Sequence, residues 1–63
     1  MFQMIEITER SNESFSEAAK QAIQKLLHQG KKIHFFEVVE QRGAVKKDQS
    51  LEYQIVLKVA IEV

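Results

Sequence analysis

The C-terminal run of residues 51–63, LEYQIVLKVAIEV, alternates two kinds of side chain along its whole length, and this pattern restricts the fold more than any other feature. One set is apolar: Leu51, Tyr53, Ile55, Leu57, Val59, Ile61 and Val63. The other set is mixed: Glu52, Gln54, Val56, Lys58, Ala60 and Glu62. Successive side chains of a β-strand point to opposite faces of its sheet, so the run predicts a strand with one buried face. At about 3.3 Å per residue the strand extends roughly 40 Å, which is long compared with the usual 5 to 6 residues or so.

The part of the chain before residue 31 predicts a strand followed by a helix. Phe2–Thr8 is rich in β-branched and aromatic residues, which favours a first strand. Ser14, followed three residues later by Glu17, has the form of a capping box and predicts the start of a helix. Apolar residues then recur at helical spacing: Phe15, Ala19, Ala22, Ile23 and Leu26. Gly30 fits the left-handed position that ends a helix, which predicts a helix of about 16 residues.

Residues 33–45, IHFFEVVEQRGAV, predict a second long strand. Strict alternation places Phe35 and Val39 on one face and Phe36, Val38 and Arg42 on the other. Because both faces then carry apolar residues, we expect both to be covered. The glycine at position 43 suggests a β-bulge or a close approach of another backbone.

These elements together predict an α+β fold with one domain spanning residues 1–63. Residues 46–50 are polar and predict a turn, so the two long strands form an antiparallel hairpin. The order is β-α-β-β, a three-stranded antiparallel sheet packed on one helix. The helix covers about 24 Å, whereas each long strand extends about 40 Å. The uncovered strand ends, with Phe36, Val38, Val56 and Ala60 on the face away from the helix, predict an apolar patch that a symmetric oligomer would bury.

Composition excludes several classes of function. The sequence has no cysteine, which excludes disulfides and thiolate metal sites. Nine Lys and Arg residues balance nine Asp and Glu residues, so there is no basic surface of the kind that binds nucleic acid. No apolar run approaches the 20 or so residues that span a bilayer, and the N-terminus lacks a signal-peptide pattern. We therefore expect a cytoplasmic protein with no nucleic-acid or membrane partner.

Few residues indicate chemistry. His28 and His34 lie in different elements without metal-ligand spacing, and nothing marks a nucleophile, so we expect no enzyme and no metal site. An interfacial catalytic site built from His34, Glu37 and Arg42 is the weaker alternative. Phe35 either packs in a core or interface, or offers a flat face to a planar ligand, with Gln54 on the neighbouring strand supplying a donor and an acceptor. Composition leaves both interpretations open.

Three segments, taken in order, resemble the dodecins: SNESFSEAAKQAI, FFEVVEQRGAV and LEYQIVLKVAIEV. The resemblance covers essentially the whole chain. It implies a β-α-β-β subunit that assembles with itself into a hollow dodecamer. It also implies a non-enzymatic role in storing or sequestering a flavin, with FMN or riboflavin as the ligand.

The resemblance further implies which residues bind. Phe35 matches the tryptophan on which the flavin stacks, Gln54 matches the glutamine that bonds the isoalloxazine edge, and Arg42 matches an arginine that can meet a phosphate. Glu62 stands where many bacterial dodecins carry an arginine. The phosphate or coenzyme A contacts assigned to that arginine are therefore not expected at Glu62. Because a phenyl ring has a smaller face than an indole, we expect weakened or altered flavin binding. The alternative is a structural shell that binds another small ligand, such as coenzyme A, or ions.

Overall fold

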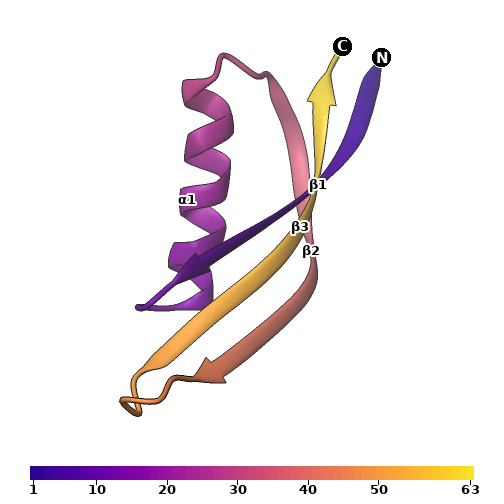
Figure 1. Cartoon of the computed structure of the whole chain (residues 1–63). Coiled ribbons are helices and arrows are strands. Elements are labelled where there is room, and N and C mark those ends of the chain that lie inside the picture. Colours follow the sequence, from indigo (N-terminus) through magenta and orange to yellow (C-terminus); the bar gives the residue numbers. More distant parts are fainter.

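The computed structural model describes residues 1–63, and it confirms the predicted order of elements. The elements are β1 (Phe2–Ser11), α1 (Phe15–His28), β2 (Ile33–Val45) and β3 (Leu51–Glu62). The strands form one antiparallel sheet in the order β1-β3-β2, so β3 is the central strand. Figure 1 shows α1 lying against one side of this twisted sheet. We call that side the helix face and the opposite side the open face.

The core lies between α1 and β3. Its buried members on the helix are Ala18, Ala22 and Leu26, and those on the strand are Ile55, Leu57, Val59 and Ile61. Ala18 was absent from the predicted apolar stripe, yet it is fully buried. The alanines leave room for the helix to approach β3 closely.

The Ser14 cap at the start of α1 and the left-handed glycine after its end form as predicted, but the reciprocal half of the capping box does not. The Ser14 hydroxyl accepts a hydrogen bond from the Glu17 amide at 2.9 Å, which satisfies one of the free donors of the first turn. The Ser14 amide is not capped by Glu17; it donates instead to the Ser11 hydroxyl at 3.5 Å. Gly30 has a φ of 82°, the predicted left-handed conformation. The helix has 14 residues, slightly fewer than predicted.

The first strand is longer than predicted. Thr8 was its expected end, because the residues that follow are polar, but pairing continues to Ser11. The last three residues of β1 are opposite Ile55, Gln54 and Tyr53. Hydrogen bonding to the long central strand overrides the polar sequence here.

Two irregularities in β2 correct the predicted faces of that strand. The pairing with β3 shifts between Ile33 and Phe35 and again between Val38 and Glu40. Each extra residue reverses the alternation, and the second reversal cancels the first, so strict alternation was wrong for residues 35–38 and right again from Glu40 to Val45. Residues that face each other on paired strands lie on the same side of the sheet. Phe35 is opposite Ala60 and therefore lies on the open face, whereas Phe36 is opposite Val59 and lies on the helix face.

The expected role of Gly43 was also wrong. Gly43 pairs regularly with Tyr53, and a Cβ atom at this position would meet nothing within 4 Å. It is neither a bulge nor a close backbone approach within the subunit.

The sheet extends beyond its helix, as the element lengths predict. The subunit measures 45 × 21 × 14 Å, and the β2–β3 hairpin projects past the N-terminal end of α1 (Figure 1). Every residue of β2 except Ile33 and Ala44 is exposed, because α1 packs on β1 and β3. The helix is neither long nor apolar enough to cross a membrane.

The composition of the predicted apolar patch needs correction. Phe36 and Val38 belong to the helix face, where they lie beyond the cover of α1 and are about half exposed. Ala60 does lie on the open face, but it is fully buried, since its small side chain lies between its register partners Met4 and Phe35. The two bulges explain why Phe36 and Val38 were placed on the wrong face. The small size of alanine explains why Ala60 is buried rather than part of an exposed patch.

Candidate functional site

The open face is organised in rows of three residues, one from each strand. At one end, Met4, Ala60 and Phe35 form an apolar row. Arg10, Gln54 and Arg42 form a polar row near the other end. We call these regions the aromatic end and the polar end. All three residues predicted to bind a ligand, Phe35, Gln54 and Arg42, lie on this face.

Aromatic side chains support one another at the aromatic end. The ring of Phe35 is 48% exposed and meets Phe2 edge to face, with centroids 5.8 Å apart and an interplanar angle of 78°. Phe2 also lies 5.7 Å from the ring of His34. The Nε2 atom of His34 lies 2.9 Å from a carboxylate oxygen of Glu62. Phe35 is therefore held on one side while part of its ring stays open to a planar ligand.

At the polar end, Gln54 is oriented by a neighbouring carboxylate. Its Nε2 donates to Oε1 of Glu52 at 2.8 Å, and this hydrogen bond is the main cause that lowers the pKa of Glu52. An ionised carboxylate only accepts hydrogen bonds, so the amide nitrogen of Gln54 must face it. The carbonyl oxygen of Gln54 is thereby left to accept a hydrogen bond from a ligand.

Arg42 lies directly across from Gln54 and is paired within its own strand. Its Nη2 donates to Oε2 of Glu40 at 2.7 Å. These residues line a shallow cavity of about 150 Å³ on the open face, together with Thr8 and Val56. The structure thus brings Gln54 and Arg42 together.

The structure does not bring Phe35 to Gln54. Phe35 is opposite Ala60, six residues along β3 from Gln54. At about 3.3 Å per residue, six residues correspond to roughly 20 Å. A single ligand ring therefore cannot contact both residues of one subunit, and a site that uses both requires two subunits.

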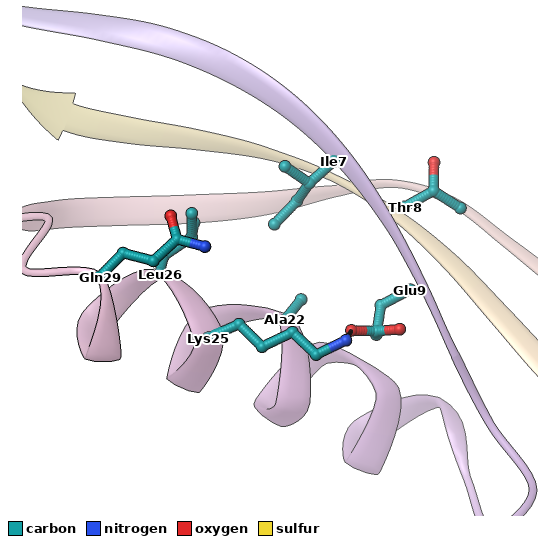
Figure 2. A pocket seen from close by; sticks show the side chains of 7 residues that line it. All are labelled: Ile7, Thr8, Glu9, Ala22, Lys25, Leu26 and Gln29. Carbon is teal, nitrogen blue, oxygen red and sulfur yellow. Dashed lines mark ion pairs between the residues drawn. The ribbon is translucent and has the colours of Figure 1, made fainter.

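A second cavity, of about 230 Å³, lies between β1 and α1. Figure 2 shows Lys25 of α1 and Glu9 of β1 reaching toward each other beside it, while Thr8 points away from the helix. Their ends are 2.5 Å apart, and the hydrogen bond from Lys25 is the main cause that lowers the pKa of Glu9. No group of three or more His, Asp or Glu side chains gathers in the subunit.

Sequence reasoning did not identify two of these contacts, Glu9–Lys25 and His34–Glu62. Their partners are 16 and 28 residues apart in the sequence. They meet only because of the strand register and the position of the helix, so no local motif signals them.

Comparison with known proteins agrees with this architecture. The dodecin family model matches residues 1–63. The chain belongs to the dodecin family. No curated protein sequence gives a significant match. Solved structures of dodecins superpose on the whole chain with TM-scores of 0.87 to 0.90.

Three of these structures show the range of the similarity. The calcium dodecin of Mycobacterium tuberculosis, described as having a novel calcium-binding site, is 28% identical, with 90% of its chain covered and a TM-score of 0.90. A tryptophan-to-phenylalanine mutant of the Thermus thermophilus dodecin is 28% identical, with 94% covered and a TM-score of 0.88. The dodecin from Streptomyces davaonensis is 25% identical, with 93% covered and a TM-score of 0.88. Family and fold together indicate a small ligand-binding protein that assembles as a dodecamer.

Proposed function

We propose that this dodecin binds and stores a flavin, FMN or riboflavin, between subunits of a homododecamer. Phe35 stacks on the isoalloxazine ring, and Gln54 of a neighbouring subunit bonds the polar edge of that ring. The observation that carries the proposal is the half-exposed ring of Phe35, braced edge to face by Phe2 on the open face of a dodecin subunit.

The geometry of each residue suits this role. Offset stacking needs a free part of an aromatic face, and Phe35 remains about half exposed while the contact with Phe2 holds its ring. The isoalloxazine edge carries an N–H group between two carbonyl groups. The free carbonyl oxygen of Gln54 is an acceptor for that N–H, because Glu52 holds the amide nitrogen.

The separation of the two residues supports a site shared by subunits. A distance of roughly 20 Å along β3 prevents Phe35 and Gln54 of one chain from meeting on one ring. The exposed β2 strand, with the half-exposed Val38 and Val39, is the kind of surface that assembly buries. Two neighbouring open faces in contact can bring Phe35 of one subunit near Gln54 of the next.

We expect the affinity to be lower than a tryptophan at position 35 would give. Replacing indole by phenyl reduces the stacked area, and aromatic pairs contribute about 0.5–1.5 kcal/mol beyond burial. A difference of about 1 kcal/mol corresponds to roughly fivefold in Kd. Arg42 contacts Glu40 through Nη2 alone, and this exposed ion pair is weak, so the other N–H donors of Arg42 remain free to meet a phosphate.

The test is a titration of flavin fluorescence with oligomer whose mass has been fixed by light scattering. Phe35→Leu removes the ring but keeps an apolar side chain, and it should abolish saturable quenching. Phe36→Leu is the matched control, since Phe36 is 45% exposed but lies on the helix face. Phe35→Trp should tighten binding by about fivefold. An intact dodecamer that quenches no flavin, or equal effects of the two leucine variants, contradicts the proposal.

A further inference from the structure

The polar end of the open face places one amide between two guanidinium groups. Arg10 of β1 and Arg42 of β2 both lie opposite Gln54 of β3, one on each side. Side chains opposite each other on paired strands have Cβ atoms about 4.5–5.5 Å apart, so the three can reach one small group together. A guanidinium only donates hydrogen bonds, whereas the amide of a glutamine can donate or accept.

The carboxylate of Glu52, which orients Gln54, is itself held in place. Its Oε1 accepts from Gln54, and its Oε2 lies 3.8 Å from Nζ of Lys46. Lys46 is anchored in turn, because its Nζ donates to Oδ1 of Asn12 at 3.2 Å. This contact joins the β2–β3 turn to the β1–α1 loop at one end of the subunit (Figure 1). Each oxygen of Glu52 thus has its own partner, and the carbonyl oxygen of Gln54 is left for a ligand.

The guanidinium groups on either side keep free donors. Arg10 is exposed and forms none of the ion pairs of the subunit. The pKa of Glu52 is lowered mainly by the hydrogen bond from Gln54 and further by the charge of Arg10, so this guanidinium lies near the Gln54–Glu52 pair. Arg42 bonds Glu40 through Nη2 alone. The row therefore offers a donor, an acceptor and a donor, in that order.

We propose that Arg10, Gln54 and Arg42 together recognise an imide edge of the bound ring, and that Arg10 is a ligand-binding residue of this site. An imide edge has an N–H between two carbonyl groups, which is an acceptor, a donor and an acceptor. Gln54 accepts from the N–H and the arginines donate to the two carbonyl oxygens, Arg42 doing so when the ligand carries no phosphate. The inference rests on the proposed function and specifies its ligand class, planar rings with an unsubstituted imide edge.

A methyl group on the edge nitrogen tests this recognition without changing the protein. The probe is 3-methylriboflavin, which keeps the stacking ring and both carbonyl groups but has no N–H for Gln54. The carbonyl oxygen of Gln54 then faces a methyl group and loses its hydrogen bond. Riboflavin should bind about tenfold more tightly than this analogue.

Fluorescence titration of the intact oligomer with both flavins then compares variants of the row. Arg10→Met removes the donors but keeps an unbranched apolar chain, and should weaken riboflavin binding about fivefold. The loss should be the same at low and high salt, because riboflavin is uncharged, and Arg10→Lys should recover part of it. Lys47→Met is the matched control, since Lys47 is exposed in the β2–β3 turn and forms no ion pair in the subunit.

Two further variants release the amide of Gln54. Glu52→Gln keeps the shape of the side chain but can donate as well as accept, so Gln54 is free to turn its N–H groups toward the ligand. The ratio of the two Kd values should then move toward one. Lys46→Met leaves Glu52 without its cation and should shift the ratio in the same direction by less.

The outcomes separate this inference from the proposed function. A tenfold or so preference for riboflavin that Glu52→Gln reduces, with a loss of affinity in Arg10→Met but not in Lys47→Met, supports both. Equal binding of the two flavins by the wild type, a ratio that Glu52→Gln leaves unchanged, or equal effects of Arg10→Met and Lys47→Met overturns the edge recognition while flavin binding stands. Failure of both flavins to bind an intact dodecamer overturns the proposed function and this inference with it.

Discussion

The two faces of β3 differ although they belong to one strand. On the helix face, Leu57 and Val59 are fully buried against α1. On the open face, Val56 is only partly buried and Lys58 is exposed. The helix face therefore carries most of the stability of the subunit, while the open face is free to present side chains to a ligand. Substitutions on the two faces should affect different measurements.

The largest expected effect comes from opening the covered face. Leu57→Ala removes a fully buried side chain and leaves a cavity, which should lower the free energy of unfolding by about 2–5 kcal/mol. Val56→Ala, one residue away on the open face, should cost less than 1 kcal/mol or so, since surface substitutions have small effects. Urea denaturation at one fixed protein concentration measures both. Similar losses for the two variants would show that assembly buries the open face as deeply as the helix buries the other.

Ala60 is the exception on the open face, and it couples stability to the proposed site. Ala60 is fully buried between Met4 and Phe35, so there is no space for the larger side chain of Ala60→Leu. This variant should lower the free energy of unfolding by about 1–3 kcal/mol. Displacement of Phe35 should also weaken flavin quenching. Ala60→Gly removes the methyl group and inserts nothing between Met4 and Phe35, so it is the control: it should keep flavin quenching and cost at most about 1 kcal/mol. A leucine variant with wild-type stability and binding would show that Met4 and Phe35 move apart easily.

Much of the fold could be predicted because it depends on local signals. Residues close together in the sequence signal three of its features: the alternating strand β3, the Ser14 cap and the left-handed Gly30. The faces of residues 35–38 in β2 could not be predicted, because the two bulges that flank them depend on pairing with β3 rather than on any glycine. The end of β1 was missed for the same reason, since Arg10 remains in the strand through its pairing with Gln54.

The candidate site shows a similar division. The resemblance to dodecins indicated Phe35, Gln54 and Arg42, and these roles stay predictions. Strict alternation had placed Phe35 and Arg42 on opposite faces, and only the bulges place both on the open face. The distance between Phe35 and Gln54, and the pairing of His34 with Glu62, required the strand register.

A smaller effect should follow from weakening the helix that makes the two faces different. Ser14→Ala removes the hydroxyl that accepts from the Glu17 amide and should cost about 1 kcal/mol. Ser16→Ala is the matched control, because Ser16 is exposed and makes no such hydrogen bond. Thermal denaturation followed by circular dichroism compares the two. Equal stability of the variants would indicate that neighbouring subunits, rather than the cap, fix the start of α1.

The smallest expected effect concerns Glu9, the one charged residue that β1 places on the helix face. Lys25 lowers the pKa of Glu9 below its ordinary value of 4.5, so folding favours the ionised carboxylate. The resulting stability is fully present above pH 4.5 and is lost as the pH falls through the lower folded value. Because Lys25 is largely exposed, Glu9→Gln should cost only about 0.5 kcal/mol at neutral pH. Urea titrations of both proteins across this range should converge in acid, and Lys25→Gln should remove the difference between them. A difference that persists in acid would mean that Glu9 acts through packing beside the cavity of Figure 2 rather than through its charge.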